Sequence, residues 1–90
     1  MLSREFTVNV EEGLHARPAS LLAQVCQKYE CSISMKSGVN VIDPKGIFGI
    51  LALAAKKGDC LTVFTEGIDE KEAMNDIAGL FERNFQEDRQ

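Results

Sequence analysis

Apolar and polar residues alternate with a period of two in four short segments of this 90-residue chain. A strand with that pattern buries only one of its two faces, so each segment needs an apolar cover on one side and leaves the other side in water. The alternating residues are Phe6, Val8 and Val10; Cys31, Ile33 and Met35; Val39 and Val41; and the run from Cys60 to Glu66. The pattern predicts a sheet with one covered face.

Three segments with helical spacing of apolar residues supply the cover. The first runs from about Ala16 to Lys28 and the second from about Gly46 to Ala54. In the third, Asp69 and Glu72 have the spacing of a capping box. The apolar face that follows comprises Ala73, Ile77, Leu80, Phe81 and Phe85. The element order β-α-β-β-α-β-α predicts a two-layer α+β domain with three helices on one face of an antiparallel sheet.

Length and composition limit the chain to one small domain that spans residues 1–90. No run of about 18 apolar residues is present, which argues against a transmembrane span. The first residues lack the long apolar core of a signal peptide, so we expect a cytoplasmic protein. A net charge of −4 disfavours binding to nucleic acid or to an anionic membrane and leaves proteins as the expected partners.

Cysteine and histidine content excludes two further kinds of site. The three cysteines, Cys26, Cys31 and Cys60, lie in apolar-patterned segments. Their odd number predicts reduced and mostly buried thiols rather than a disulfide framework. With one histidine and no Cys-x-x-Cys pair, the sequence predicts no metal site.

His15 is the only histidine, and it stands where a loop becomes the first helix, in the run Gly13-Leu14-His15-Ala16-Arg17-Pro18-Ala19-Ser20. Pro18 fits the first turn of a helix, where a missing N–H leaves no hydrogen bond unmade. The N–H groups of that turn and the helix dipole favour an anion, and Arg17 adds a permanent charge. Such surroundings favour a neutral, nucleophilic imidazole that can accept a phosphoryl group. The alternative is an ordinary surface or capping histidine.

The second helical segment is apolar on all sides from Ile47 to Ala55. In a 90-residue two-layer domain one side of such a helix must face solvent. Some of Ile47, Phe48 and Leu51 are therefore expected in an exposed apolar patch, which usually marks a protein contact. The alternative is a short core helix whose outer face is merely poor in polar residues.

The run Gly13-Leu14-His15-Ala16-Arg17-Pro18-Ala19 resembles the active-site signature of the histidine-containing phosphocarrier protein (HPr) family of the bacterial phosphoenolpyruvate-dependent sugar phosphotransferase system. Residues 45–51 look like the second helix of that family, Lys57-Gly58 like the turn after it, and residues 66–70 like the start of its last helix. The resemblance extends roughly from residue 4 to residue 85. It implies an open-faced β-sandwich with strand order 1-4-2-3.

The resemblance also implies a monomeric phosphocarrier that needs no metal or bound cofactor. His15 would take a phosphoryl group from phosphorylated enzyme I through Nδ1 and pass it to the A component of a sugar-specific enzyme II. The N–H groups of Ala16 and Arg17 would hold the phosphoryl oxygens, and the Arg17 guanidinium would offset their charge. The residues expected to dock these partners are Ile47, Phe48, Leu51, Ser20 and Gln24.

Two positions depart from the family pattern. Gly46 stands where the Gram-positive branch has a regulatory serine, so no hydroxyl is present for its ATP-dependent kinase. Glu12 stands where a small polar residue is common, and its carboxylate would repel a phosphoryl group if it turned inward. An alternative function is a regulatory paralogue, for example of the nitrogen-related branch, that acts mainly through protein binding. Retention of His15, Arg17 and Pro18 favours a working acceptor, because a pure adaptor needs no nucleophile.

Overall fold

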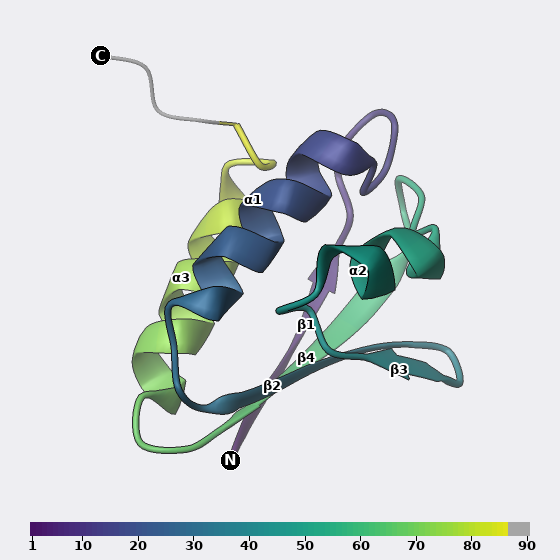
Figure 1. Ribbon diagram of the computed structural model, residues 1–90. Coiled ribbons are helices and arrows are strands. Elements are labelled where there is room, and N and C mark those ends of the chain that lie inside the picture. Colours follow the sequence, from purple (N-terminus) through teal and green to yellow (C-terminus); the bar gives the residue numbers. More distant parts are fainter. Residues whose placement is uncertain (87–90) are drawn as a thin grey trace.

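The computed structural model describes residues 1–86 and arranges them as a sheet with helices on one face (Figure 1). The elements are β1 (Leu2–Thr7), α1 (Ala16–Gln27), β2 (Ser32–Ser37), β3 (Asn40–Ile42), α2 (Ile47–Leu53), β4 (Cys60–Glu66) and α3 (Glu70–Glu82). The strand order is β1-β4-β2-β3 and all neighbours are antiparallel. The predicted element order, the two-layer α+β architecture and the strand order 1-4-2-3 are confirmed.

The register of the strands explains the period-two pattern. Leu61, Val63 and Thr65 of β4 are buried under the helices, whereas the residues between them lie on the open face. Ile33 and Met35 of β2 are buried in the same way. On the covered side α1 packs between α2 and α3 (Figure 1). The single covered face predicted from the alternation is therefore present in β2 and β4. The prediction is wrong for Val39 and Val41, because Val39 precedes β3 and is 93% exposed and Val41 is 59% exposed. Val8 and Val10 lie beyond the end of β1.

The three cysteines do not share one environment. Cys26 and Cys31 are buried, but Cys60 is exposed, so the prediction of mostly buried thiols fails for this residue. Cys60 precedes the buried Leu61, and alternation places it on the open face, where its Sγ lies 3.7 Å from the Thr7 hydroxyl. Burial raises the pKa of the Cys26 thiol to about 12. All three are free thiols, as the odd number predicted.

The start of α3 uses different contacts from those predicted. Asp69 is the N-cap residue, but its side chain makes no capping hydrogen bond within the helix. Its carboxylate instead accepts hydrogen bonds from the backbone N–H groups of Glu30 and Cys31, each at 2.9 Å. The predicted capping box with Glu72 is wrong, because Asp69 is engaged by the connection between α1 and β2. The hydrogen bond from Glu30, first among several contacts, holds the pKa of Asp69 below its ordinary value.

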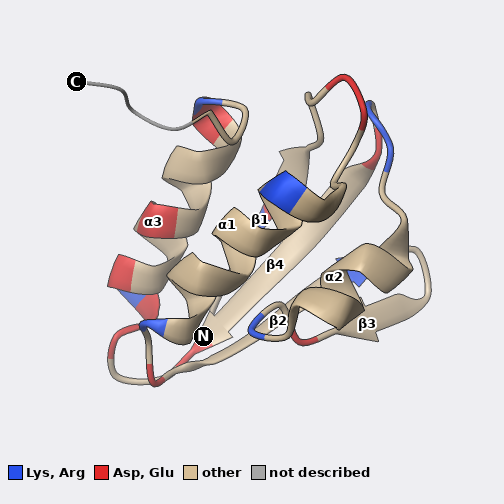
Figure 2. Cartoon of the chain, turned by 45° about the horizontal axis from the view of Figure 1, so that its top comes forward, with Lys and Arg blue, Asp and Glu red and all other residues tan. Residues whose placement is uncertain are grey.

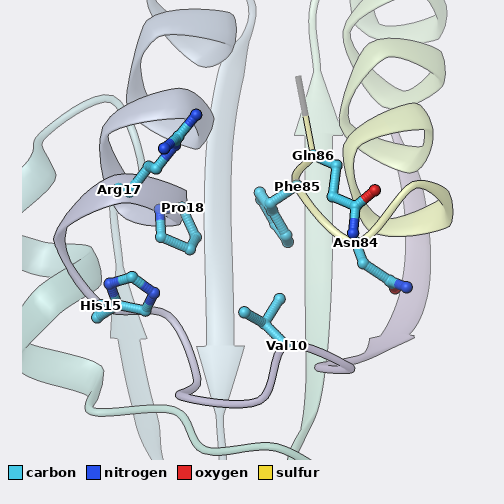
Figure 3. A pocket seen from close by; sticks show the side chains of 7 residues that line it. All are labelled: Val10, His15, Arg17, Pro18, Asn84, Phe85 and Gln86. Carbon is cyan, nitrogen blue, oxygen red and sulfur yellow. The ribbon is translucent and has the colours of Figure 1, made fainter. Parts of the chain in front are cut away.

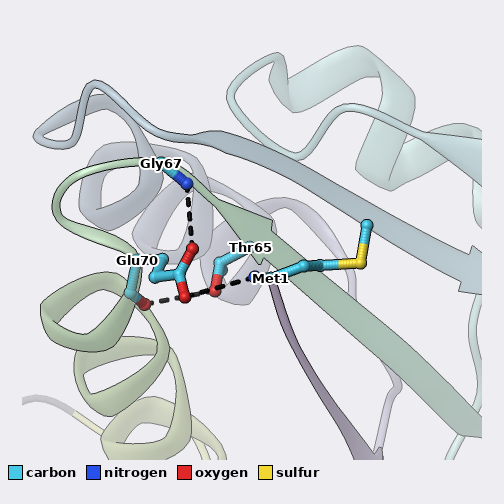
Figure 4. A network of polar contacts seen from close by, with 4 residues as sticks. All are labelled: Met1, Thr65, Gly67 and Glu70. Carbon is cyan, nitrogen blue, oxygen red and sulfur yellow. Dashed lines mark hydrogen bonds and ion pairs between the residues drawn. The ribbon is translucent and has the colours of Figure 1, made fainter.

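Glu70 stabilises the turn before α3 (Figure 4). Its carboxylate accepts a hydrogen bond from the Gly67 N–H at 3.0 Å and pairs with the terminal ammonium of Met1 at 3.4 Å. The hydroxyl of buried Thr65 donates to the Glu70 carbonyl oxygen at 3.1 Å. These contacts fix the connection between β4 and α3 without a capping box.

A lysine ties the end of α1 to the start of α2. The Lys45 ammonium donates hydrogen bonds to the carbonyl oxygens of Tyr29 and Cys31, both at 2.8 Å. In return the Gln27 side-chain amide donates to the Lys45 carbonyl oxygen at 2.7 Å. We call this set of contacts the Lys45 clamp. These contacts join the end of α1 and the segment after it to a residue shortly before the start of α2.

The surface formed by α1 and α2 is almost uncharged (Figure 2). Arg17 is the one charged residue of the two helices, whereas α3 carries four acidic side chains and one basic side chain. None of the helices that residues 1–86 form is both long and apolar enough to cross a membrane.

Candidate functional site

His15 is the N-cap residue of α1, and its side chain is 43% exposed. Its carbonyl oxygen accepts the first intrahelical hydrogen bond, from the Ala19 N–H at 2.9 Å. The imidazole makes no capping hydrogen bond, so it stays at the surface. The backbone N–H groups of Ala16 and Arg17 precede the first intrahelical bond and lie at the positive end of the helix dipole. The expected pairing of an exposed imidazole with an anion-favouring helix start is therefore present.

Gly13 fits the His15 loop against the segment that follows α2. Its φ is +75°, and a Cβ at this position would lie only 2.3 Å from the Ala55 carbonyl oxygen. The next residue, buried Leu14, donates its N–H to the same oxygen at 3.0 Å. Nearby, the Lys57 ammonium pairs with Glu11 at 3.0 Å. These contacts hold the loop, and with it His15, beside the end of α2.

A pocket of about 350 Å³ opens beside His15 (Figure 3). Its lining residues are Val10, His15, Arg17, Pro18, Asn84, Phe85 and Gln86. One wall is therefore the start of α1, and the opposite wall is the turn that follows α3. Apolar side chains of Val10, Pro18 and Phe85 alternate in this lining with polar ones.

The second wall of the pocket was not expected from the sequence. The helical spacing in the sequence assigns Phe85 to the apolar face of the last helix, but α3 ends at Glu82. Asn84 and Phe85 both adopt left-handed backbone conformations, with φ of +54° and +60°. The Phe85 ring is buried and packs edge-on against Phe81, with ring centroids 4.9 Å apart. The one local signal for this turn is Asn84, since asparagine tolerates the left-handed region.

Arg17 lines the same pocket, but its side chain does not face the imidazole. Figure 3 shows the guanidinium extending away from His15 along α1. The charge of Arg17 is therefore not directed at the imidazole in this structure. For the guanidinium to neutralise a phosphoryl group on His15, this long and exposed side chain has to turn.

Glu12 turns toward the histidine. Its Oε1 lies 3.7 Å from His15 Nε2, although the Glu12 side chain as a whole is 78% exposed. The inward orientation considered for this carboxylate is therefore the one observed. A negative charge stands beside the imidazole and partly offsets the positive environment that the helix start provides.

The expected docking residues lie on α1 and α2, which pack side by side (Figures 1 and 2). Phe48 is 82% exposed, whereas Ile47 and Leu51 are only half-buried and partly pack on the core. On α1, exposed Gln24 donates its side-chain amide to the hydroxyl of half-buried Ser20 at 3.3 Å. The exposed apolar surface expected on the second helix is therefore centred on Phe48.

An open-faced α+β sandwich that presents one exposed histidine at a helix start defines the class of small histidine phosphocarrier domains. Comparison with known proteins agrees with this class, because the family model described as "PTS HPr component phosphorylation site" matches residues 2–83. The chain belongs to the HPr family of the phosphotransferase system.

Individual relatives match over nearly the whole chain. The phosphocarrier protein HPr of Xylella fastidiosa is 36% identical over 88 residues, which are 98% of this chain and 99% of the relative. The HPr-like protein Crh of Halalkalibacterium halodurans is 32% identical over 92% of this chain and 99% of its own. Among solved structures, HPr-C-His from Thermoanaerobacter tengcongensis has a TM-score of 0.92 at 31% identity and covers 99% of this chain and 100% of its own.

Proposed function

We propose that this chain carries phosphoryl groups on His15, taking them from phosphorylated enzyme I and passing them to the A component of a sugar-specific enzyme II. The observation that carries the proposal is the exposed imidazole at the N-cap of α1, beside the first-turn N–H groups of the helix. Membership in the HPr family supports it. On this proposal residues 1–90 form one cytoplasmic and monomeric carrier domain.

The chemistry needs only the side chains and backbone of this chain and its partners. The Nδ1 lone pair of His15 attacks the phosphorus of a phosphohistidine on the donor, and a new N–P bond forms as the old one breaks. The donor nitrogen keeps the electron pair of the broken bond. The N–H groups of Ala16 and Arg17 hold the phosphoryl oxygens, and the Arg17 guanidinium turns to offset their charge. No bound metal or cofactor takes part in this step.

The partners dock on the surface around Phe48. Ile47, Leu51, Ser20 and Gln24 extend it on α1 and α2, where Arg17 is the one charged side chain. An exposed aromatic residue surrounded by uncharged side chains is typical of a surface that contacts another protein. Because the His15 loop is packed against the end of α2, a partner bound there reaches the imidazole at the same time.

A second candidate function is a regulatory paralogue that acts by binding target proteins. The observation in its favour is the 32% identity to the HPr-like protein Crh. The retained run of His15, Arg17 and Pro18 favours the carrier, since an adaptor that only binds has no need for a nucleophile.

The test is to incubate the protein with phosphoenolpyruvate and enzyme I and to measure its intact mass. The carrier gains one acid-labile phosphoryl group, and the His15→Ala variant gains none. A second incubation with several enzyme II A components then identifies the acceptor. A phosphoryl group that persists in His15→Ala, or an unmodified wild-type protein, would refute the assignment.

A further inference from the structure

Two neighbouring carboxylates in the loop before α1 make different contacts. Glu11 pairs with the Lys57 ammonium at 3.0 Å, away from the histidine. Glu12 lies with its Oε1 3.7 Å from His15 Nε2. The backbone between Glu12 and His15 is fixed by Gly13 and Leu14, which fit closely against Ala55. The Glu12 carboxylate therefore lies on the Nε2 side of the ring, whereas the Glu11 carboxylate is engaged by Lys57.

A carboxylate on one side of an imidazole decides where its proton resides. The distance of 3.7 Å is too long for a direct hydrogen bond, but the Coulomb attraction between the carboxylate and a proton on Nε2 acts over it. The neutral ring therefore favours the tautomer with the proton on Nε2. Nδ1 then keeps its lone pair and is the nucleophile, in the way that a carboxylate partner orients the histidine of a catalytic triad.

We propose that Glu12 is a positioning residue for His15, which selects Nδ1 as the nucleophile and makes the phosphorylated form short-lived. This inference rests on the proposed function. When Nδ1 attacks phosphorus and the donor N–P bond breaks, the His15 ring keeps its Nε2 proton and becomes a cation beside the Glu12 carboxylate. When the phosphoryl group leaves, the electron pair of the N–P bond returns to Nδ1 and the ring becomes neutral again.

Glu12 acts on the phosphorylated ring through its charge. Its carboxylate lies beside the imidazole and repels the phosphoryl oxygens, which favours loss of the phosphoryl group. Other charged groups among residues 1–86 lie near this loop. Arg17 lines the pocket with its guanidinium turned away from His15, and the opposite charges of Glu11 and Lys57 offset each other. Glu12 is thus the group that shortens the lifetime.

The test compares Glu12→Gln with Glu11→Gln, because both variants remove one carboxylate from the same loop and only the first faces His15. His15 is phosphorylated with phosphoramidate, a small chemical donor, and the half-life of the phosphohistidine is measured from mildly acidic to mildly alkaline pH. We expect Glu12→Gln to lengthen the half-life about fivefold on the alkaline side, as expected for unit charges at 3.7 Å in water with some screening by salt. Glu11→Gln should match the wild type.

A second measurement uses the unphosphorylated protein, in which ¹⁵N chemical shifts of the imidazole report the tautomer. The Nε2–H form should dominate in the wild type and in Glu11→Gln and should lose population in Glu12→Gln. Equal half-lives and tautomers in all three proteins would overturn the inference, and so would equal changes in the two variants. If enzyme I does not phosphorylate the wild type, the proposed function fails, while the tautomer comparison still decides the role of Glu12.

Discussion

Replacing Gly13 by alanine tests how closely the His15 loop is fitted to the segment after α2. The new Cβ would lie 2.3 Å from the Ala55 carbonyl oxygen, whereas ordinary contacts begin at 3.4 Å. The difference, 3.4 minus 2.3, requires a displacement of about 1 Å. A displacement of that size lengthens and breaks the hydrogen bond from the Leu14 N–H to the same oxygen, now 3.0 Å.

Three contributions make up the expected loss of unfolding free energy in Gly13→Ala. A side chain in the left-handed region costs about 1 kcal/mol, the lost hydrogen bond about 1 kcal/mol, and the residual overlap about 1 kcal/mol. The matched control is Gly38→Ala, because Gly38 has a φ of +62° and nothing within 4 Å of its added Cβ. Gly38→Ala should lose only the cost of a side chain in the left-handed region, about 1 kcal/mol.

Urea unfolding measures both losses. With unchanged m-values, Gly13→Ala should be less stable than Gly38→Ala by about 2 kcal/mol. Phosphorylation of His15 should also slow in Gly13→Ala, because the imidazole moves with the loop. Equal destabilisation by the two substitutions would refute the close fit described for Gly13.

Four further outcomes are expected. Arg17→Ala should slow phosphorylation by about tenfold with little change in the melting curve, and an unaltered rate would contradict a role in offsetting charge. Phe48→Asp should weaken binding to enzyme I in a titration but leave cooperative unfolding intact, since this ring is 82% exposed. Gly46→Ser should become a substrate of the ATP-dependent kinase, while phosphoserine on the wild type, mapped by mass spectrometry, would defeat that expectation. Asp69 has a pKa below its ordinary 3.8 in the folded protein, so the stability it contributes is present above that pH and is lost as the pH falls through the lowered pKa. In acid titrations, Asp69→Asn should show less of this loss than the wild type.

Local patterns predicted the elements because strand alternation and helix periodicity are properties of short segments. Leu61, Val63 and Thr65 on one face of β4 illustrate this. The order of the strands depends on contacts between distant segments, and here it was available only through the resemblance of the His15 run to a known family. The exposed position of Cys60 follows from the same alternation, although an apolar neighbourhood in the sequence suggested burial.

The geometry of the candidate site was predictable where it depends on the start of one helix and unpredictable where other segments contribute. His15 and the first turn of α1 lie as expected. The pocket wall at Asn84 and Phe85 arises because the chain leaves the helix in a left-handed turn, which a helical periodicity does not reveal. The contacts of Glu12 and Asp69 depend on which rotamer each side chain adopts, and the sequence does not favour one rotamer over another.

The Lys45 clamp has a thermodynamic consequence for association. By joining the end of α1 to the start of α2, it restrains the two helices that carry the surface around Phe48 before any partner arrives. A rigid surface loses little conformational entropy on binding, so a small contact area is sufficient for a specific complex. A small area with few charges also releases its partner quickly. On the proposed function, successive partners would use the same surface in turn, each staying only long enough for one transfer.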